Sequence, residues 1–290
     1  MPEDKPGEIE SEWNRGKGII LDEQEEKQIG TEQGAPPTLH KGAYASRALG
    51  RQQPYAYLLP AGWDGSAGRC FPLLLLLHGR DGSYLDWPTH TRIAHYAARY
   101  ALCVVFPEGD NGWYTNAVGG ASRYEDDLVH ALVPHIQATL PVLPPGKHWG
   151  IGGLSMGGYG AVKLALKYPR LFSLAVSHSG ALEKPRQPEP HPVFGDPQAD
   201  AAFRLSENPF WLAEQAMCRF PTERPRLYLD CGLNDELLEA NRRFHDHLTF
   251  IGYRHTYQEM PGYHTWPYWN RAIRTVLPEV AAALGADTKE

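Results

Sequence analysis

The sequence lacks a long hydrophobic run, a cluster of basic residues and an evident export signal. Its longest apolar run, residues 71–77, is too short to span a bilayer and is typical of a buried strand. A net charge of −6 without any Lys/Arg run argues against nucleic acid or an anionic membrane as partner. Because the first residues are polar and acidic, we expect a cytoplasmic protein by default, or a secreted one if a signal was removed.

Metal-binding and disulfide patterns are also missing. None of the four cysteines is in CxxC spacing, and Cys103 and Cys231 fall in or beside apolar runs, so we interpret them as ordinary core residues. His245 and His247 are two residues apart and therefore point to different faces of a helix, and HExxH spacing does not occur. We predict no metal, no cofactor and a small-molecule partner.

The composition divides the chain at about residue 40. Residues 1–40 are polar and rich in glutamate and end near Gly34-Ala35-Pro36-Pro37, which predicts a loosely packed acidic arm. Residues 41–290 have the length of a single α/β domain, long enough to bury roughly three quarters of the unfolded surface. We therefore expect one catalytic domain after the arm.

Strand-like and helix-like segments alternate from residue 43 onward. The expected strands are residues 43–49, 53–59, 71–77, 102–106, 149–154, 174–179, 226–231 and 254–259. The expected helices are residues 87–100, 124–140, 156–167, 208–217, 235–251 and 266–284. This alternation predicts an α/β fold with a mostly parallel central sheet and helices on both faces. The first two strands follow each other directly, which suits an antiparallel edge, and the Pro-rich residues 185–197 suggest an excursion that forms a lid or substrate wall.

Ser155 is the candidate nucleophile. It stands in Gly153-Leu154-Ser155-Met156-Gly157, between an apolar strand and a helical segment rich in small residues. A tight strand-to-helix turn of this kind exposes the serine Oγ, and it needs glycine two positions either side because a Cβ there would meet backbone. The alternative interpretation is a glycine-rich structural turn.

A serine hydroxyl needs a base, and that base needs an orienting acid. In proteins with this turn the order along the chain is Ser, acid, His. Asp235 follows the strand 226–231 in a turn, and Asp230, within the end of that strand, is its competitor. His264 lies in a loop after the last strand, whereas His255 is internal to that strand and is a weaker candidate. A surface loop histidine is the alternative for His264.

An oxyanion hole should complete the site, because acyl transfer builds negative charge on the carbonyl oxygen. The backbone N–H of Met156, directly after the nucleophile, is one candidate donor. The loop His78-Gly79-Arg80 after the strand 71–77 offers the second, where Gly79 permits close approach and the Arg80 N–H points at the carbonyl. A simple turn at a strand end is the alternative.

Taken together, these motifs resemble the esterase D family of α/β-hydrolases, which includes tributyrin-type and feruloyl-type esterases, S-formylglutathione hydrolases and mycolyltransferases. The matching runs are Leu75–Gly79, Gly153–Gly160, Cys231–Asp235, and Pro261–Trp266 with Trp269. The resemblance covers residues 42–285 and implies the α/β-hydrolase fold, a Ser155/Asp235/His264 triad, and Arg80 and Met156 as the oxyanion pair.

The function expected is that of a serine carboxylesterase that hydrolyses small acyl or aromatic esters through an acyl-enzyme. Acyl transfer, or thioester hydrolysis as in S-formylglutathione hydrolases, would use the same triad. A binding protein that kept the fold is the non-enzymatic alternative. Trp113, Tyr114, Trp266 and Trp269 are candidates for an aromatic-walled pocket, and packing under long loops explains them equally well.

Overall fold

A computed structural model describes residues 36–66, 68–286 and 288 of the chain. Residues Ala35–Glu290 form one compact unit. The predicted acidic arm, residues 1–40, lies outside the described residues apart from 36–40. None of the helices in the described ranges is long and apolar enough to cross a membrane.

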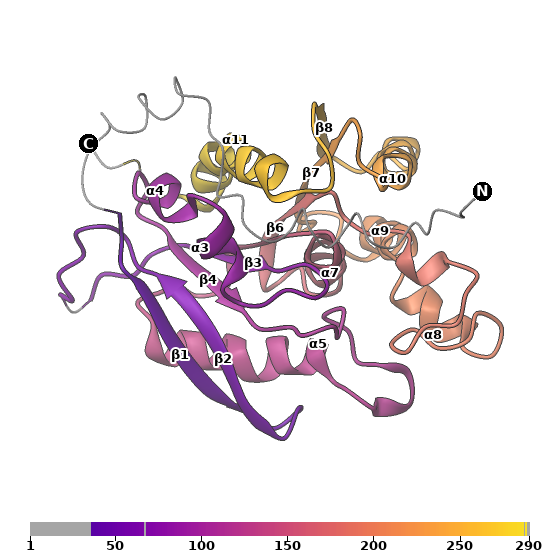
Figure 1. Cartoon of the computed structure of the whole chain (residues 1–290), viewed down its shortest axis with the longest axis horizontal. Coiled ribbons are helices and arrows are strands. Elements are labelled where there is room, and N and C mark those ends of the chain that lie inside the picture. Colours follow the sequence, from indigo (N-terminus) through magenta and orange to yellow (C-terminus); the bar gives the residue numbers. More distant parts are fainter. Residues whose placement is uncertain (1–35, 67, 287, 289–290) are drawn as a thin grey trace, which may run out of the picture. The chain divides into compact units, whose positions relative to one another are not determined.

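A single sheet of eight strands forms the centre of this unit (Figure 1). The strands are β1 (Leu39–Ser46), β2 (Arg51–Leu58), β3 (Leu73–Leu77), β4 (Cys103–Pro107), β5 (Gly146–Leu154), β6 (Phe172–His178), β7 (Arg226–Gly232) and β8 (His255–Met260). They lie in the order β1-β2-β4-β3-β5-β6-β7-β8. Strands β1 and β2 pair antiparallel, as β2 does with β4, and all later pairs are parallel. The antiparallel edge and the mostly parallel sheet are as the sequence predicts.

The helices and helical turns connect these strands. They are α3 (Asp86–His90), α4 (Ile93–Ala97), η1 (Val118–Gly120), α5 (Tyr124–Asp126), η2 (Asp127–Leu132), α6 (Val133–Thr139), α7 (Met156–Lys167), η3 (Lys184–Arg186), α8 (Ala201–Ser206), α9 (Pro209–Arg219), α10 (Leu238–Phe250) and α11 (Trp266–Leu284).

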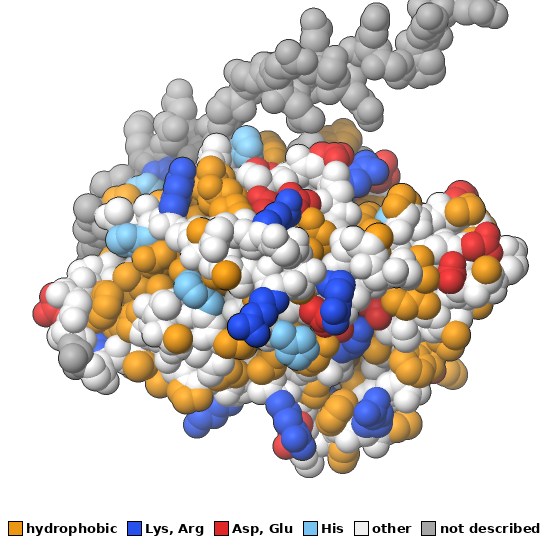
Figure 2. Space-filling model, turned by 90° about the horizontal axis from the view of Figure 1, so that it is seen from below, with side chains coloured by type: hydrophobic (Ala, Val, Ile, Leu, Met, Phe, Trp, Pro, Cys, Tyr) orange, Lys and Arg blue, Asp and Glu red, His pale blue; other side chains and the backbone are white. Residues whose placement is uncertain are grey.

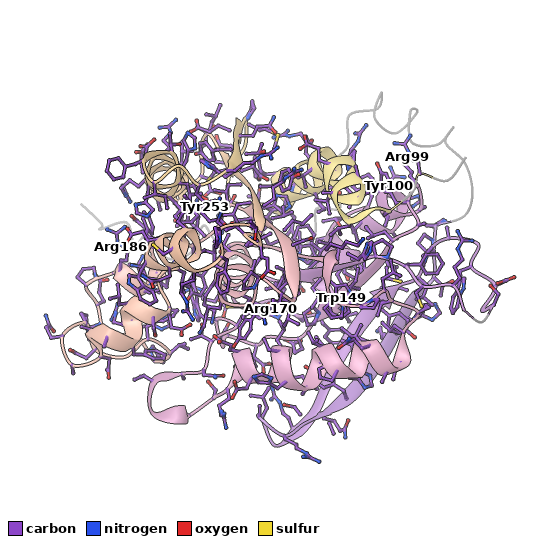
Figure 3. The ribbon with its side chains drawn as sticks, turned by 180° about the vertical axis from the view of Figure 1, so that it is seen from behind. Arg99, Tyr100, Trp149, Arg170, Arg186 and Tyr253 are labelled. Carbon is purple, nitrogen blue, oxygen red and sulfur yellow. The ribbon has the colours of Figure 1, made fainter. Side chains whose placement is uncertain are left out.

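Both faces of the sheet are covered by helices, which gives two hydrophobic cores. Side chains of β3 alternate between them: Leu73, Leu75 and Leu77 pack with α7, α9 and α10, whereas Leu74 and Leu76 pack with α4 and α11. This burial on both faces explains why β3 is a continuous apolar run. Figure 3 shows the side chains that fill these layers, with the fully buried Trp149 of β5 labelled.

Two expected helices differ from the observed ones. The segment 87–100 is broken into α3 and α4, because Thr91 Oγ1 donates to the Trp87 carbonyl and the Arg92 N–H donates to Asn270 Oδ1 (2.9 Å) from α11. The segment 124–140 contains a π-helical stretch, η2, between α5 and α6. The contact with Asn270 joins residues far apart in sequence, so local periodicity could not reveal the break.

The Pro-rich residues 185–197 form an ordered excursion after β6, which begins in η3 and is followed by the unpredicted short helix α8. Arg204 of α8 is buried and donates to several backbone carbonyls of the excursion. The acceptors are the carbonyl oxygens of Pro185, Gln187, Glu189 and Gly195. A single guanidinium therefore holds the excursion in shape.

Candidate active site

Ser155 lies between β5 and α7 in a strained backbone conformation. Its φ of 52° and ψ of −116° place it in a region that residues with a Cβ rarely adopt. The surrounding structure fixes this geometry, since the Ser155 N–H donates to the His178 carbonyl (3.0 Å) and the Ser155 carbonyl accepts from the Ala181 N–H (3.0 Å). The serine side chain is half-buried at the carboxyl end of the parallel sheet.

The glycines on either side of Ser155 are required by close backbone contacts. A Cβ added at Gly153 would lie 2.5 Å from the Gly157 carbonyl carbon. One added at Gly157 would lie 2.4 Å from the Leu77 carbonyl oxygen, at the end of the neighbouring strand β3. Both distances are shorter than any packed Cβ contact, so the turn depends on these two glycines.

Asp235 and His264 are joined by a hydrogen bond. His264 Nδ1 lies 2.9 Å from Asp235 Oδ2 and 3.0 Å from Oδ1. The loops after β7 and β8 meet through backbone bonds, from the Leu233 N–H to the Met260 carbonyl and from the Asn234 N–H to the Gly262 carbonyl (both 2.9 Å). The predicted acid and base therefore lie together, in the loops after β7 and β8, the two strands that follow β5 and β6 in the sheet.

The environment of Asp235 favours the carboxylate. Burial of the side chain would raise its pKa, but the hydrogen bonds from His264 and the Leu237 N–H, together with the charge of His264, hold the pKa below its ordinary value. The Leu237 N–H lies 2.8 Å from Asp235 Oδ1. The hydrogen bonds of the described side chains do not include one between Ser155 Oγ and His264 Nε2.

The loop after β3 lies beside the nucleophile. A Cβ added at Gly79 would be 3.6 Å from Ser155 Cβ. The ring of the buried His78 bonds the Gly79 carbonyl through Nδ1 (2.7 Å) and accepts from the Gly109 N–H through Nε2 (2.9 Å). The His78 ring thus holds Gly79 next to Ser155. Arg80, whose N–H the sequence predicts as the second oxyanion donor, follows Gly79 directly in the chain. Met156, the first, is fully buried at the start of α7.

The four candidate pocket aromatics occupy different surroundings. Tyr114 is 1% exposed and donates from its hydroxyl to the His78 carbonyl (3.1 Å), beneath the loop just described. Trp113 packs edge-on against Tyr159 with ring centroids 5.7 Å apart. Trp269 lies perpendicular to His264 (4.9 Å). Trp266, in turn, packs edge-on against Trp269 (5.1 Å) and is the half-buried member of the set.

A cluster of four charged side chains, three buried and Lys167 half-buried, connects α7 to neighbouring segments. Lys163, fully buried, donates to Glu125 (2.7 Å), Glu207 (3.0 Å) and the Tyr114 carbonyl (2.7 Å). Lys167 bonds the same two glutamates (2.8 and 2.9 Å). Burial would raise the pKa of Glu125, but the two lysines lower it to about 2. The cluster therefore ties α7 to the segment that carries Trp113 and Tyr114.

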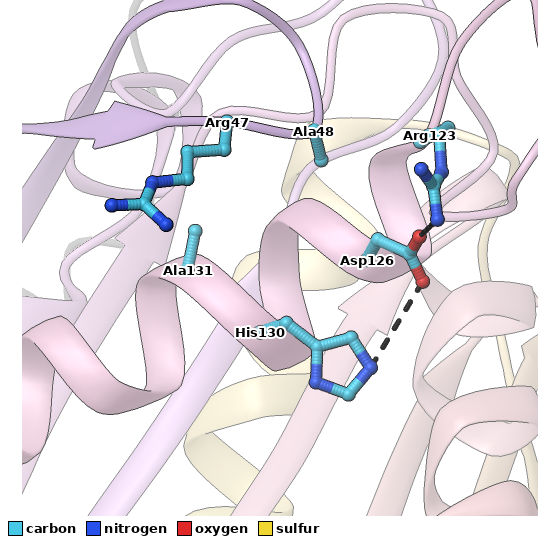
Figure 4. Close-up of a pocket in the computed structure, with 6 residues that line it drawn as sticks. All are labelled: Arg47, Ala48, Arg123, Asp126, His130 and Ala131. Carbon is cyan, nitrogen blue, oxygen red and sulfur yellow. Dashed lines mark ion pairs between the residues drawn. The ribbon is translucent and has the colours of Figure 1, made fainter.

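A pocket of about 290 Å³ lies away from these residues (Figure 4). Its lining comes from the β1–β2 turn and the α5–η2 region: Arg47, Ala48, Arg123, Asp126, His130 and Ala131. Asp126 pairs with Arg123 and lies 4.0 Å from His130. The pocket contains none of the predicted catalytic residues.

Two features near the site escaped sequence reasoning. His178 Nδ1 lies 2.6 Å from Asp230 Oδ2, and the Tyr268 hydroxyl donates to Oδ1 (2.8 Å), so the Asp230 carboxylate bonds side chains of a buried cluster. Ser179, expected as the last residue of a strand, lies just beyond β6 with a φ of 49°. The Ser-Gly pair at positions 179 and 180 was the only sequence signal for this turn.

Comparison with known proteins identifies the family. The protein-family model described as "Putative esterase" matches residues 46–280 of this chain. The chain is 29% identical over 217 residues to an acetyl esterase from Caldicellulosiruptor saccharolyticus, covering 69% of this chain and 79% of the relative. It is 26% identical over 237 residues to the diacylglycerol acyltransferase/mycolyltransferase Ag85C from Mycobacterium leprae, covering 69% of this chain and 71% of the relative.

Among solved structures, FphF, a fluorophosphonate-binding serine hydrolase of Staphylococcus aureus, matches with a TM-score of 0.74. The match has 23% identity and covers 86% of this chain and 99% of that one. It confirms the α/β-hydrolase fold. The family model spans most of the described domain, which confirms the resemblance seen in the motifs: the chain belongs to this esterase family.

Proposed function

We propose that the protein is a serine esterase that hydrolyses small acyl or aromatic esters through an acyl-enzyme on Ser155. The observation that carries the proposal is the Asp235–His264 hydrogen bond, two and three strands along the sheet from the strained turn at Ser155. Nucleophile, acid and base thus follow the carboxyl ends of β5, β7 and β8 in one sheet. The net charge of −6 and the interspersed basic and acidic side chains in Figure 2 support a small-molecule partner rather than nucleic acid.

In the acylation step His264 Nε2 takes the proton of Ser155 Oγ as the oxygen attacks the ester carbonyl carbon. Asp235 holds Nδ1 protonated and turns Nε2 toward the serine. The N–H groups of Met156 and Arg80 donate to the oxyanion, and His264 then gives the proton to the departing alcohol. Water attacks the acyl-enzyme in the second half, with His264 again as the base. Ester cleavage in this scheme needs no metal and no cofactor.

The substrate contacts are proposed on the aromatic side of the site. Trp269 lies next to His264 and Trp266 packs against Trp269, so a group bound there would pack against indole rings. Trp113 and Tyr114, on the segment held by Lys163, are almost fully buried, so their proposed role is to pack behind the site and not to contact the substrate. Similarity to an acetyl esterase favours short acyl groups, and indole surfaces also suit aromatic acids.

Acyl transfer to an alcohol is the second candidate, because the chain is also similar to a mycolyltransferase. Both reactions share the acyl-enzyme and differ in whether water or another alcohol takes the acyl group. Thioester hydrolysis, as in S-formylglutathione hydrolases, would use the same residues. A non-enzymatic binding protein would not need the Asp235–His264 pair.

A substrate panel tests the proposal. We expect purified protein to release 4-nitrophenol from esters of graded chain length, fastest with short acyl chains, and methyl ferulate and S-formylglutathione should be tested beside them. EDTA should leave the rates unchanged. Adding glycerol or a sugar as acceptor reveals transfer as a new ester product. Failure to cleave any ester in the panel, or activity lost to EDTA and restored by a divalent cation, would contradict the proposal.

A further inference from the structure

The Pro-rich excursion after β6 begins beside the predicted nucleophile. The Ala181 N–H donates to the Ser155 carbonyl (3.0 Å), and the Lys184 N–H, at the start of η3, donates to the Ala181 carbonyl (3.1 Å). Lys184 is therefore one turn of backbone away from a residue that holds Ser155 in its strained conformation. The sequence suggests a substrate wall at this excursion, and the first side chain of η3 is a cation.

The side chain of Lys184 lies over an aromatic ring that also packs near Ser155. Lys184 Nζ is 5.7 Å from the centroid of the Trp113 ring, within the range of a cation–π interaction. Trp113 packs edge-on against Tyr159 (5.7 Å), whose N–H donates to the Ser155 carbonyl (3.0 Å) in the first turn of α7. Contacts through the backbone and through the indole ring both lead back to Ser155, which places the ammonium close to the nucleophile.

This ammonium forms no ion pair within the part of the chain that the structure describes. Lys184 Nζ donates to Gln187 Oε1 (2.7 Å), which is a neutral amide. The adjacent carboxylate, Glu183, is bound instead by Arg186 (3.6 Å) and by Arg243 Nε (2.9 Å). Because Lys184 is half-buried, its charge is partly removed from water without a counter-ion, an arrangement that costs free energy. An anionic ligand would supply the missing charge.

The surroundings of Lys184 add positive charge. Burial, and then the charge of Arg80, lower the pKa of Lys184, whereas the exposed Glu189 raises it. The side chain of Arg80 itself pairs with the exposed Asp81 (3.5 Å). His191 packs edge-on against the same indole ring (5.5 Å), and burial followed by Lys184 lowers its pKa to about 4, so this histidine is neutral at pH 7. A negative group beside Lys184 would be attracted by more than one cation.

We propose that Lys184 determines substrate specificity by binding a carboxylate of the substrate, so that the enzyme prefers esters that carry a carboxylate over neutral esters of similar size. The inference rests on the proposed esterase function and names a substrate class for the same site. The substrate carboxylate accepts from Lys184 Nζ while the ester carbonyl lies at Ser155. A lysine ammonium acts as a point charge with rotatable donors, so the carboxylate can belong to the acyl group or to the alcohol.

Two matched pairs of esters test the preference and distinguish these two positions. On the acyl side, the 4-nitrophenyl monoester of adipic acid is compared with 4-nitrophenyl hexanoate, which has a methyl group in place of the carboxylate. On the alcohol side, 4-acetoxybenzoate is compared with its methyl ester. We expect wild type to favour the anionic member of one pair by about tenfold or more in kcat/KM. Hydrolysis of these esters without such a preference in either pair overturns the inference and leaves the proposed function intact.

Lys184→Met removes the charge and keeps a long apolar stem over Trp113. In this variant the ratio of kcat/KM for the anionic ester to that for its neutral partner should fall about tenfold, mostly through KM. Arg186→Met is the matched control in the same turn (Figure 3), because the Arg186 guanidinium lies over Phe210 (4.3 Å) and pairs with Glu183; it should keep the wild-type ratio.

Lys184→Gln is the second variant, and it should show the same fall in the ratio. A ratio unchanged by both Lys184 substitutions, or an equal fall in Arg186→Met, overturns the inference. Wild-type protein that cleaves none of the four esters would instead reject the proposed function, and this inference with it.

Discussion

His178 and Asp230 form a second, buried histidine–aspartate pair, with Nδ1 2.6 Å from Oδ2, beside the pair formed by His264 and Asp235. The two residues stand in register on β6 and β7. Both oxygens of Asp230 are occupied, since the Tyr268 hydroxyl binds the other one. Asp230, at the end of β7, and Asp235, in the loop after it, therefore bond different partners, and only Asp235 bonds the predicted base.

This division predicts opposite outcomes for two amide substitutions. Asp235→Asn should lower kcat by about 10³- to 10⁴-fold, because the amide no longer holds His264 in the required tautomer. Asp230→Asn should change kcat less than about tenfold and instead cost about 1–3 kcal/mol of stability, through the weakened bonds to His178 and Tyr268. Steady-state kinetics and urea unfolding of both variants distinguish them. A larger kinetic loss in Asp230→Asn would make Asp230 the catalytic acid.

The glycine before the nucleophile gives a prediction about folding stability. Gly153→Ala should cost about 2 kcal/mol or more, because its Cβ would lie 2.5 Å from the Gly157 backbone, which cannot move without disturbing Ser155. Gly152→Ala is the matched control on the same strand, where the nearest atoms, 3.1 and 3.2 Å away, belong to the side chains of Leu76 and Val176. Urea unfolding measures the free energy of unfolding of both variants, and an equal loss of stability in the two would contradict the account.

The buried charge cluster predicts how stability depends on pH. The folded-state pKa of Glu125, about 2, lies below the ordinary 4.5 of an unfolded chain, so its stabilising contribution is present above pH 4.5 and is lost as the pH falls toward 2. The free energy of unfolding should thus fall more steeply over this range in wild type than in Glu125→Gln. Urea unfolding from pH 7 down to pH 3 measures this difference. Parallel plots of the free energy of unfolding against pH for wild type and Glu125→Gln would contradict the prediction.

The sequence predicted what depends on local pattern. The turn at Ser155, the loop positions of Asp235 and His264 and the parallel core are encoded by glycine spacing, strand ends and apolar runs. The break between α3 and α4 depends on Asn270, and the position of the Ser179 side chain depends on a hydrogen bond from Trp269, both of which are distant in sequence. Such contacts are set by tertiary packing and leave no periodic signal.

The central claim is that Ser155 is the activated nucleophile, and covalent labelling tests it most directly. Wild-type protein treated with a fluorophosphonate should gain the mass of one adduct, located on the peptide that contains Ser155, and should lose esterase activity in parallel. Ser155→Ala should fold, gain no adduct and release no 4-nitrophenol above a low residual rate. The control is Ser177→Ala, which removes a buried hydroxyl of β6 that has no hydrogen-bond partner within the described structure, and it should label as wild type does. An adduct on Ser155→Ala, or full ester hydrolysis by that variant, would contradict the account.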